Sequence, residues 1–468
     1  MARMQQPIDP RIFRAYDVRG VALTQLTEDA ARRIARGFGS VLRERMPGKT
    51  PKVCVGRDAR THGPLLERAV IEGLTSAGCD VYAIGATPSP LSYFTICDAP
   101  FDGGMQVTAS HNPAPDNGLK LSLAQAHAYA GDDLQDLRVR IEEGRFAEGS
   151  GAVREYDGTT PYLAYLKERF SGALSGMTIV VDSGNGIAGP VYCQALRDAG
   201  AEVVELYTEP DGTFPNHPAD PSKHATLKEL QETVRAKEAD LGFGFDGDGD
   251  RLGLVDETGA IRTPDEILLL LAEDMLSRKP GTPVVFTVSN SGILQTEIPR
   301  LGGVPHLCKV GHSFVEHAMQ ETGALVGGEQ SGHFFCAEDY FEFDDALMAA
   351  LRVAAIAKRA GVPLSAHLAR FPKVYQAHER RPSVPDDKKW SVIESVQKHF
   401  AAERDVVTLD GARIDFGEGA WAGIRASNTS PCISICAEAR SPEKLKEVEE
   451  AVLRHLETYP EISWESDH

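Results

Sequence analysis

The chain has 468 residues, 42% of them hydrophobic and 25% charged, a composition typical of a globular protein of three or four domains. Its formal net charge of −19 argues against nucleic acid as a partner, because nucleic-acid binding needs a basic surface. The longest apolar run is far too short to cross a membrane and no signal peptide is recognisable, so we expect a cytoplasmic protein with no membrane partner.

One pattern occurs three times along the chain: a β-rich run, a polar or glycine-containing loop, a helical stretch and a second strand. The three copies begin with KVCVGRDAR at 52–60, MTIVVDSGNG at 177–186 and TPVVFTVSNSG at 282–292. Strands that alternate with helices predict parallel sheets with helices on both faces. The repeat therefore predicts three similar α/β domains.

Turn-rich stretches suggest the domain boundaries. Residues 147–158 are expected to be a linker, and Thr263 is expected to cap a helix whose first residue is Pro264. The last part of the chain offers a helix, strands over 405–416, 420–427 and 432–439, and a final helix after Ser441, which is typical of a small α+β domain. The predicted domains are 1–154, 155–256, 257–372 and 373–468.

Residues 107–121 read VTASHNPAPDNGLKL and place Ser110 in an unusual context. A nucleophilic serine usually lies on a sharp, glycine-flanked elbow or beside a general base. Ser110 is instead followed by turn-forming residues and then by Pro113. We therefore expect a loop that presents this serine to a metal ion and to a substrate hydroxyl.

Residues 241–253, LGFGFDGDGDRLG, end an apolar run in three aspartates separated by glycines, namely Asp246, Asp248 and Asp250. Three neighbouring carboxylates repel one another unless a cation neutralises them. Hard oxygen ligands suit Mg²⁺ or Ca²⁺, and Mg²⁺ is the usual partner of phosphate chemistry. The spacing therefore predicts a magnesium site.

Two other kinds of protein carry similar carboxylate patterns. An EF-hand calcium loop has acids at its first, third, fifth and twelfth positions, which this chain matches with Asp246, Asp248, Asp250 and Glu257. Its sixth position should be glycine but is Arg251, and a strand, not a helix, is expected before Asp246. A haloacid-dehalogenase-type phosphatase would use Asp246 as its nucleophile, but that family usually has threonine or valine where this chain has Asp250.

The serine loop and the aspartate loop together suggest phosphoryl transfer. Ser110 would carry a phosphate, which adds a charge of about −1.5 to −2. Mg²⁺ held by the three aspartates would neutralise that charge and polarise the phosphorus for attack.

Taken together, the motifs resemble those of the α-D-phosphohexomutase superfamily, especially its phosphomannomutase/phosphoglucomutase enzymes, over nearly the whole chain. The resembling stretches are FRAYDVRG (13–20), VGRDAR (55–60), the phosphoserine loop TASHNP (108–113), the Mg²⁺ loop DGDGDR (246–251), the sugar-binding loop GEQSGH (328–333) and the phosphate-binding loop RASNTSP (425–431). The resemblance implies three similar α/β domains with mixed, mostly parallel sheets plus a C-terminal α+β domain, heart-shaped around a central cleft.

The resemblance also implies roles for individual residues. The phosphoserine would transfer its phosphoryl group to a hexose phosphate, and the resulting hexose 1,6-bisphosphate would turn around before returning a phosphoryl group to the serine. One Mg²⁺ per chain would be held by Ser110, Asp246, Asp248 and Asp250. The candidates for the general base are Arg19, His111, Lys120 and His333, with Arg251 supporting the metal loop. Substrate would be bound by Tyr16, Lys309, His312, Glu329, Ser331, Arg425, Ser427, Asn428 and Thr429.

The choice of hexose depends on a few positions. GEQS at 328–331 is more usual in phosphoglucosamine mutases, and TVSNSG at 287–292 looks less like the mannose and glucose enzymes, which often have a lysine at the position of Ser289. FRAYDVRG, in contrast, resembles the mannose and glucose enzymes. We expect a phosphomannomutase/phosphoglucomutase that acts on small-molecule sugar phosphates, as a monomer or dimer, with a hexose 1,6-bisphosphate as intermediate and activator. A phosphoglucosamine mutase is the near alternative. A metal-dependent phosphatase and a non-catalytic sugar-phosphate-binding protein are the alternatives of other classes.

Overall fold

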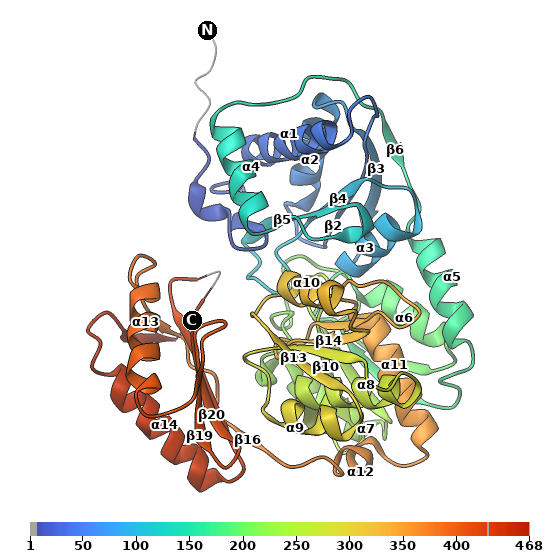
Figure 1. Ribbon diagram of the computed structural model, residues 1–468. Helices are drawn as coiled ribbons and strands as arrows, with labels where there is room; N and C mark the ends of the chain where they lie inside the picture. Colours follow the sequence, from blue (N-terminus) through green and yellow to red (C-terminus); the bar gives the residue numbers. More distant parts are fainter. Residues whose placement is uncertain (1–6, 428–429, 468) are drawn as a thin grey trace. The chain divides into compact units, whose positions relative to one another are not determined.

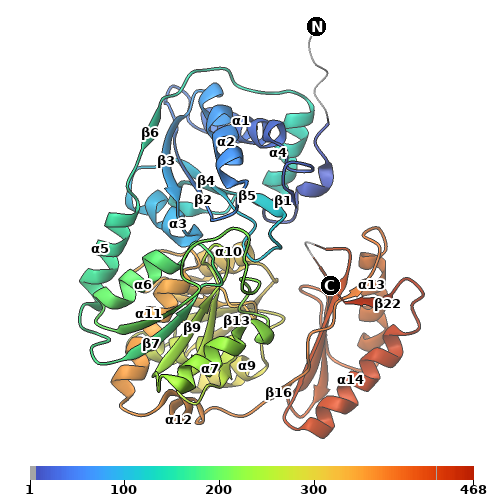
Figure 2. The ribbon, with the colours of Figure 1, turned by 180° about the vertical axis from the view of Figure 1, so that it is seen from behind.

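The computed structural model describes residues 7–427 and 430–467. The chain divides into two compact units, each built from two separate segments. The first comprises the described residues up to Thr263 together with Ser331–Ser365, and the second comprises Pro264–Gln330 together with the described residues from Ala366 onward. Figure 1 and Figure 2 show the helices and strands from two opposite sides.

The first unit begins with a six-stranded mixed sheet. Its strand order is β1 (Val18–Val21), β5 (Asp116–Leu123), β4 (Gly103–Val107), β2 (Lys52–Arg57), β3 (Asp80–Ala86) and β6 (Val153–Glu155). Strands β4, β2, β3 and β6 are parallel, and β5 runs antiparallel to both of its neighbours. The turn between β4 and β5 carries Ser110, so the sheet fixes both ends of the serine loop.

Helices cover both faces of this sheet (Figure 1). They are α1 (Glu28–Arg45), α2 (Gly63–Ser76), α3 (Ser89–Asp98) and α4 (Asp132–Glu142). Successive residues of a strand point to opposite faces. A side chain on Gly103 would meet Leu42 of α1, and one on Gly104 would meet Ile96 of α3, so these two helices lie on opposite faces.

A second mixed sheet in the same unit carries the aspartate loop. Its strand order is β11 (Ile261–Arg262), β10 (Leu252–Asp256), β9 (Leu241–Phe245), β7 (Thr178–Asp182) and β8 (Glu202–Leu206). Its helices are α5 (Thr159–Phe170), α6 (Gly189–Asp198), α7 (Lys228–Ala236) and, from the later segment, α11 (Ala346–Ala360), which contacts β9 and β10. The strand β15 (Phe334–Cys336) precedes α11. Three 3₁₀ turns complete the unit, at Pro10–Ile12, Ala124–Ala126 and His224–Leu227.

The second unit begins with three parallel strands and their helices. β12 (Pro283–Thr287) lies between β13 (Val304–Cys308) and β14 (Val326–Gly328). The helices are α8 (Pro264–Arg278), α9 (Ile293–Arg300) and α10 (His312–Thr322), and the short α12 (Leu364–Leu368) follows at the return of the chain. The predicted helix start is confirmed, because α8 begins at Pro264.

The C-terminal part of this unit is a five-stranded antiparallel sheet with two helices. The strand order is β16 (Tyr375–Gln376), β21 (Ile433–Ala439), β20 (Ala420–Ala426), β19 (Ala412–Gly417) and β18 (Val406–Val407). A separate strand pair joins β17 (Pro382–Ser383) to β22 (Ser463–Asp467). The helices are α13 (Lys389–Ala401) and α14 (Pro442–Leu456), and the Ser441 side chain caps the second as expected.

The predicted fold class is confirmed: three parts have parallel strands flanked by helices, and the last part is α+β. One local prediction is incomplete and another is wrong. The expected linker at 147–158 connects α4 to α5, but it also contains the edge strand β6, because Gly149 and Gly151 let the backbone lie directly against Gly78 and Cys79. The expected single strand over 405–416 is two strands, because the chain turns at Gly411, whose φ is +81°. Within the described residues, no helix combines the length and apolarity that a membrane crossing requires.

Candidate active site

The aspartate loop is a tight hairpin that winds around one of its own carboxylates. β9 ends at Phe245, and Oδ1 of Asp246 accepts hydrogen bonds from the backbone N–H groups of Gly249, Asp250 and Arg251 at 3.0–3.1 Å. The loop enters and leaves through the antiparallel pair β9–β10. This hairpin excludes an EF-hand, which needs a helix on either side of its loop.

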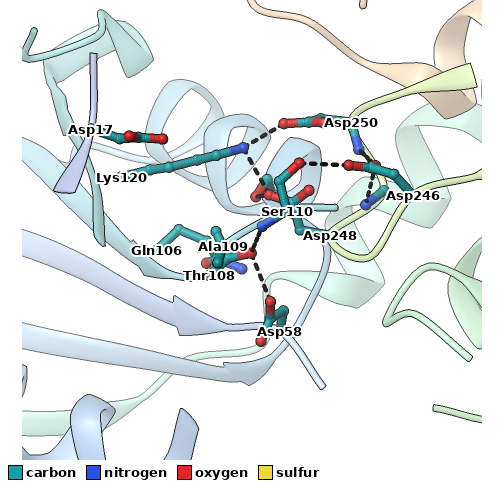
Figure 3. Close-up of polar contacts among 12 residues, drawn as sticks. Asp17, Asp58, Gln106, Thr108, Ala109, Ser110, Lys120, Asp246, Asp248 and Asp250 are labelled. Carbon is teal, nitrogen blue, oxygen red and sulfur yellow. Dashed lines mark hydrogen bonds and ion pairs between the residues drawn. The ribbon is translucent and has the colours of Figure 1, made fainter. Parts of the chain in front are cut away.

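The other two aspartates of the loop are held by Ser89 at the start of α3 and by Lys120 on β5. Asp248 Oδ2 accepts from the Ser89 hydroxyl at 2.6 Å and from Lys120 Nζ at 2.7 Å, and Lys120 Nζ also donates to Asp250 Oδ2. Figure 3 shows the Lys120 side chain extended between these two carboxylates. Burial opposes the charge on the Lys120 ammonium, but its two carboxylate partners raise its pKa well above the ordinary value.

The carboxylates of the aspartate loop raise one another's pKa unless a cation lies beside them. Burial, together with the charges of Asp250 and Asp248, raises the pKa of Asp246 well above its ordinary value. Burial opposes the ionisation of Asp250 as well, but the cations around it, led by Lys120, lower its pKa. A divalent cation bound among these carboxylates would relieve the repulsion between them.

The three aspartates also have the geometry and the available atoms that a metal ion needs. One oxygen from each lies within 4.8 Å of the others, and all three residues are buried. Among the described residues, Asp248 Oδ1 and Asp250 Oδ1 are buried without any hydrogen-bond partner, which is costly unless something else contacts them. An all-oxygen donor set of this kind fits Mg²⁺.

Ser110 lies against the aspartate loop and is only 1% exposed. Its hydroxyl donates to Asp246 Oδ2 at 2.6 Å, a contact visible in Figure 3, and its Oγ lies 3.1 Å from His111 Nδ1. The Ser110 backbone has φ of +51°, a left-handed conformation that is strained for any residue other than glycine. The structure therefore brings the predicted serine and metal residues together.

Two basic candidates border the serine loop. Arg19 on β1 donates to Asp17 at 2.7 Å and to the Asn112 side chain at 2.8 Å. Burial opposes the charge of Arg19, but Asp17 and then Tyr16 raise its pKa. Burial, followed by the charges of Arg251 and Arg19, holds the pKa of His111 well below its usual value. His111 is therefore a neutral imidazole beside Ser110.

His333 is oriented by a carboxylate that the sequence did not indicate. His333 Nδ1 lies 2.6 Å from Asp344 Oδ2, and Arg251 Nε donates to His333 Nε2 at 3.0 Å. Because Nε2 accepts a hydrogen bond, the proton of a neutral ring is on Nδ1, where it points to Asp344. Arg251 also lies 3.9 Å from Asp220.

Three predicted substrate residues of the second unit lie in or against the loop that precedes α10, namely Lys309, His312 and Glu329. Glu329, which is 3% exposed, accepts from the backbone N–H of Gly311 at 2.7 Å. The neighbouring N–H of Val310 donates to Asp410 at 2.9 Å. Lys309 Nζ lies 5.8 Å from the centre of the Phe314 ring, and His312 is the first residue of α10. The sugar-loop residue Ser331 belongs to the first unit.

The predicted phosphate loop follows β20. Arg425 is on that strand, and among the described residues its Nε is buried without a hydrogen-bond partner. Ser427 Oγ accepts from the backbone N–H of Ser430 at 3.1 Å. Lys389, which the sequence did not indicate, donates to the carbonyls of Ser427 at 2.7 Å and Ser430 at 3.3 Å. The remaining predicted residues, Asn428 and Thr429, lie outside the described residues.

Models of the phosphoglucomutase/phosphomannomutase family match the chain in order: alpha/beta/alpha domain I over 10–148, domain II over 160–259, domain III over 263–375 and the C-terminal domain over 381–455. A phosphomannomutase/phosphoglucomutase of Pseudomonas aeruginosa is 40% identical over 438 residues, 93% of each chain. A phosphoglucomutase of Neisseria gonorrhoeae is 35% identical, covering 97% of this chain and 98% of its own. The crystal structure of a phosphoglucomutase/phosphomannomutase family protein from Burkholderia thailandensis has a TM-score of 0.89 at 37% identity, covering 96% of this chain and 98% of its own. The chain therefore belongs to the phosphoglucomutase/phosphomannomutase family, as its motifs predict.

Proposed function

We propose that the protein is a phosphohexomutase that interconverts the 1-phosphate and 6-phosphate of mannose, glucose or both. The enzyme would work through a phosphorylated Ser110 and a hexose 1,6-bisphosphate. The observation that carries this proposal is the 2.6 Å contact between the Ser110 hydroxyl and Asp246, inside a buried group of three aspartates. Family membership supports the same activity.

The metal would be Mg²⁺, bound by Asp246, Asp248, Asp250 and a phosphoryl oxygen on Ser110. When bound, the ion supplies positive charge that stabilises the transferring phosphoryl group. Lys120 shares oxygens of Asp248 and Asp250, so its ammonium would move toward the phosphoryl oxygens as the carboxylates turn to the ion. Within the part of the chain that the structure describes, Asp248 Oδ1 and Asp250 Oδ1 accept no hydrogen bond, which supports this assignment.

In the transfer step, the bond between phosphorus and Ser110 Oγ breaks as a bond forms from phosphorus to the sugar hydroxyl oxygen. The hydroxyl proton passes to a base, and we assign that role to His333 Nε2, which would first exchange its hydrogen bond from Arg251 for one from the sugar hydroxyl. The 2.6 Å contact with Asp344 orients this ring and would stabilise the imidazolium that forms. Ser110 Oγ takes up a proton as it leaves, and the Lys120 ammonium, which the structure holds protonated beside Asp248 and Asp250, would supply it.

The second phosphate of the substrate would bind at the loop that follows β20. Arg425 offers a bidentate fork, and Ser427, Asn428 and Thr429 offer hydroxyl, amide and backbone donors. Sugar hydroxyls would be bound by Glu329 and Ser331, with Tyr16, Lys309 and His312 as further substrate contacts. The unpartnered Nε of Arg425 among the described residues supports the phosphate assignment.

A phosphoglucosamine mutase is the second candidate, and the observation that favours it is Gln330 in the loop GEQS. Mannose and glucose differ only at C2, and a loop that grips the 3- and 4-hydroxyls would distinguish them little. Parallel assays with the 1-phosphates of mannose, glucose, glucosamine and N-acetylglucosamine decide between the two. Turnover of the amino sugars alone would replace the first candidate by the second.

Intact-protein mass spectrometry tests the phosphoserine. After incubation with glucose 1,6-bisphosphate, the protein should carry one added phosphate, and Ser110→Ala should carry none and lose nearly all mutase activity. Ser395→Ala, which changes an exposed serine of α13, is the control and should behave like the original protein. Full turnover in Ser110→Ala would refute the mechanism and would point to a phosphatase that uses Asp246.

A further inference from the structure

Arg60 lies directly under the serine loop and is completely buried. Its Nε donates to Asp58 Oδ2 at 3.0 Å. Its two terminal nitrogens donate to four backbone carbonyls of the serine loop, at 2.6–2.8 Å, and these belong to Ser110, Asn112, Pro113 and Asp116. The loop is thus wound around one guanidinium group, and each nitrogen of the side chain has a partner.

The backbone N–H of Ser110 is held through Asp58, the carboxylate that also binds Arg60. Asp58 Oδ2 accepts from the Thr108 hydroxyl at 2.7 Å, and Thr108 Oγ1 in turn accepts from the backbone N–H of Ser110 at 2.9 Å, as Figure 3 shows. Asp58 Oδ1 accepts from the backbone N–H of Arg60 at 3.0 Å. Both the N–H and the C=O of Ser110 are therefore fixed by hydrogen bonds, and this explains how its left-handed φ of +51° is maintained.

The loop after β8 and the aspartate loop itself pack against this arrangement. The ring of Phe214 lies 5.2 Å from the Arg60 guanidinium, and a side chain on Gly212 would overlap the backbone of Arg60. A side chain on Gly247, inside the aspartate loop, would overlap the carbonyl oxygen of Ser110. The buried charge is therefore shielded from water by the same elements that must meet Ser110.

We propose that Asp58, Arg60 and Thr108, which we call the serine-loop clamp, are positioning residues that hold the Ser110 hydroxyl against the metal aspartates. The inference rests on the proposed function. Because one half-reaction takes the phosphoryl group from Ser110 and the other returns it, the clamp would serve both with a single loop conformation. A planar guanidinium is needed, because a lysine ammonium has three donors and cannot reach four carbonyls and a carboxylate at once.

Steady-state and single-turnover kinetics of Arg60→Lys and Thr108→Val test the clamp. Arg60→Lys keeps the buried positive charge but loses the two terminal nitrogens that donate to the loop carbonyls. We expect kcat to fall about 100-fold, because a displacement of a reacting group by about 1 Å has this effect. KM should change less than about threefold. Thr108→Val removes both hydrogen bonds of the hydroxyl, the one to Asp58 and the one from the Ser110 N–H, with little change of side-chain shape, and should lower kcat at least about tenfold. In single turnovers, loss of phosphate from Ser110 to glucose 1-phosphate and its return from glucose 1,6-bisphosphate should slow by similar factors.

Arg262→Lys is the matched control. Arg262 also pairs with a buried aspartate, Asp256, but at the opposite end of β10 from the aspartate loop, so kcat and KM should not change. Failure of the unmodified protein to take up phosphate would refute the proposed function itself. If the unmodified protein turns over and both clamp variants keep its kcat, the clamp is refuted. If Arg60→Lys does not fold, Thr108→Val decides alone.

Discussion

Replacing Lys120 by Met tests whether its ammonium and Mg²⁺ compete for the same carboxylate oxygens. Lys120 is 5% exposed, and its Nζ lies 2.7 Å from Asp248 Oδ2 and also contacts Asp250. At an effective dielectric constant of about 20, opposite charges at this distance attract by about 6 kcal/mol, and the removal of both groups from water offsets part of that energy. Deleting one partner of a buried ion pair typically destabilises a protein by about 3–5 kcal/mol. We expect a loss of that size for Lys120→Met in the presence of a chelator.

Magnesium should reverse much of this loss, because the variant offers its carboxylates without a competing cation. An ion present at about 100 times its Kd stabilises the folded state by about 2.7 kcal/mol. Lys120→Met should bind Mg²⁺ at least about tenfold more tightly than the original protein, which adds about 1.4 kcal/mol at the same Mg²⁺ concentration. Thermal unfolding with chelator and with Mg²⁺, together with calorimetric titration of Mg²⁺, measures both effects.

The control for this experiment is Lys167→Met. Lys167 is 59% exposed and lies 3.6 Å from Asp198, so its loss should change stability by less than about 1 kcal/mol, equally with and without Mg²⁺. Equal stabilisation of the original protein and Lys120→Met by Mg²⁺ would refute the competition, and with it the assignment of the ion to these oxygens.

Three further substitutions have defined outcomes. Gly247→Ala would overlap the carbonyl of Ser110, so kcat should fall about 100-fold, and an unchanged kcat in a steady-state assay would contradict the close approach of the two loops. A hydrogen bond to Asp182 raises the pKa of His217 despite burial, so its stabilising effect is complete below the ordinary histidine pKa and is lost as pH rises through the raised value. In urea unfolding, His217→Gln should therefore lose about 1–2 kcal/mol near pH 5.5 and less near pH 9, and an equal loss at both would exclude the ion pair. Tyr162→Phe removes a 2.9 Å bond to the aspartate that caps α11 and should lose about 1.5–3 kcal/mol, and a loss below about 0.5 kcal/mol in the same assay would count against that bond.

Local sequence patterns were sufficient for the fold class and for the two loops that form the centre of the site. The aspartate spacing and the run of turn residues after Ser110 each indicated a loop, and the structure places Ser110 Oγ 2.6 Å from Asp246. Lys120 was a candidate from the family resemblance, and it lies between two of the aspartates. The four domain boundaries and the individual roles stay predictions.

The residues that sequence reasoning missed act through contacts that are distant along the chain. Ser89 bonds to a residue 159 positions away, and no local pattern distinguishes it from any other serine at a helix start. Asp344 precedes a helix-capping aspartate and shows no sign of its histidine partner. An arginine such as Arg60 is ordinarily exposed, so complete burial could be inferred only from the fold. Ser110 has a positive φ without the glycine that usually marks one.

The chain leaves the first unit, forms part of the second and then returns to the first, and this limits where the protein can be divided for expression. Ser331–Ser365 belongs with the N-terminal half, although Pro264–Gln330 before it does not. A truncation product that starts at Pro264 would carry α11 without β9 and β10, leaving apolar residues such as Leu347 and Leu351 in water. Such a fragment should aggregate. The matching N-terminal fragment would lack α11, which packs against β9 and β10, so its core would be incomplete. The two fragments should therefore be soluble only when they are produced together.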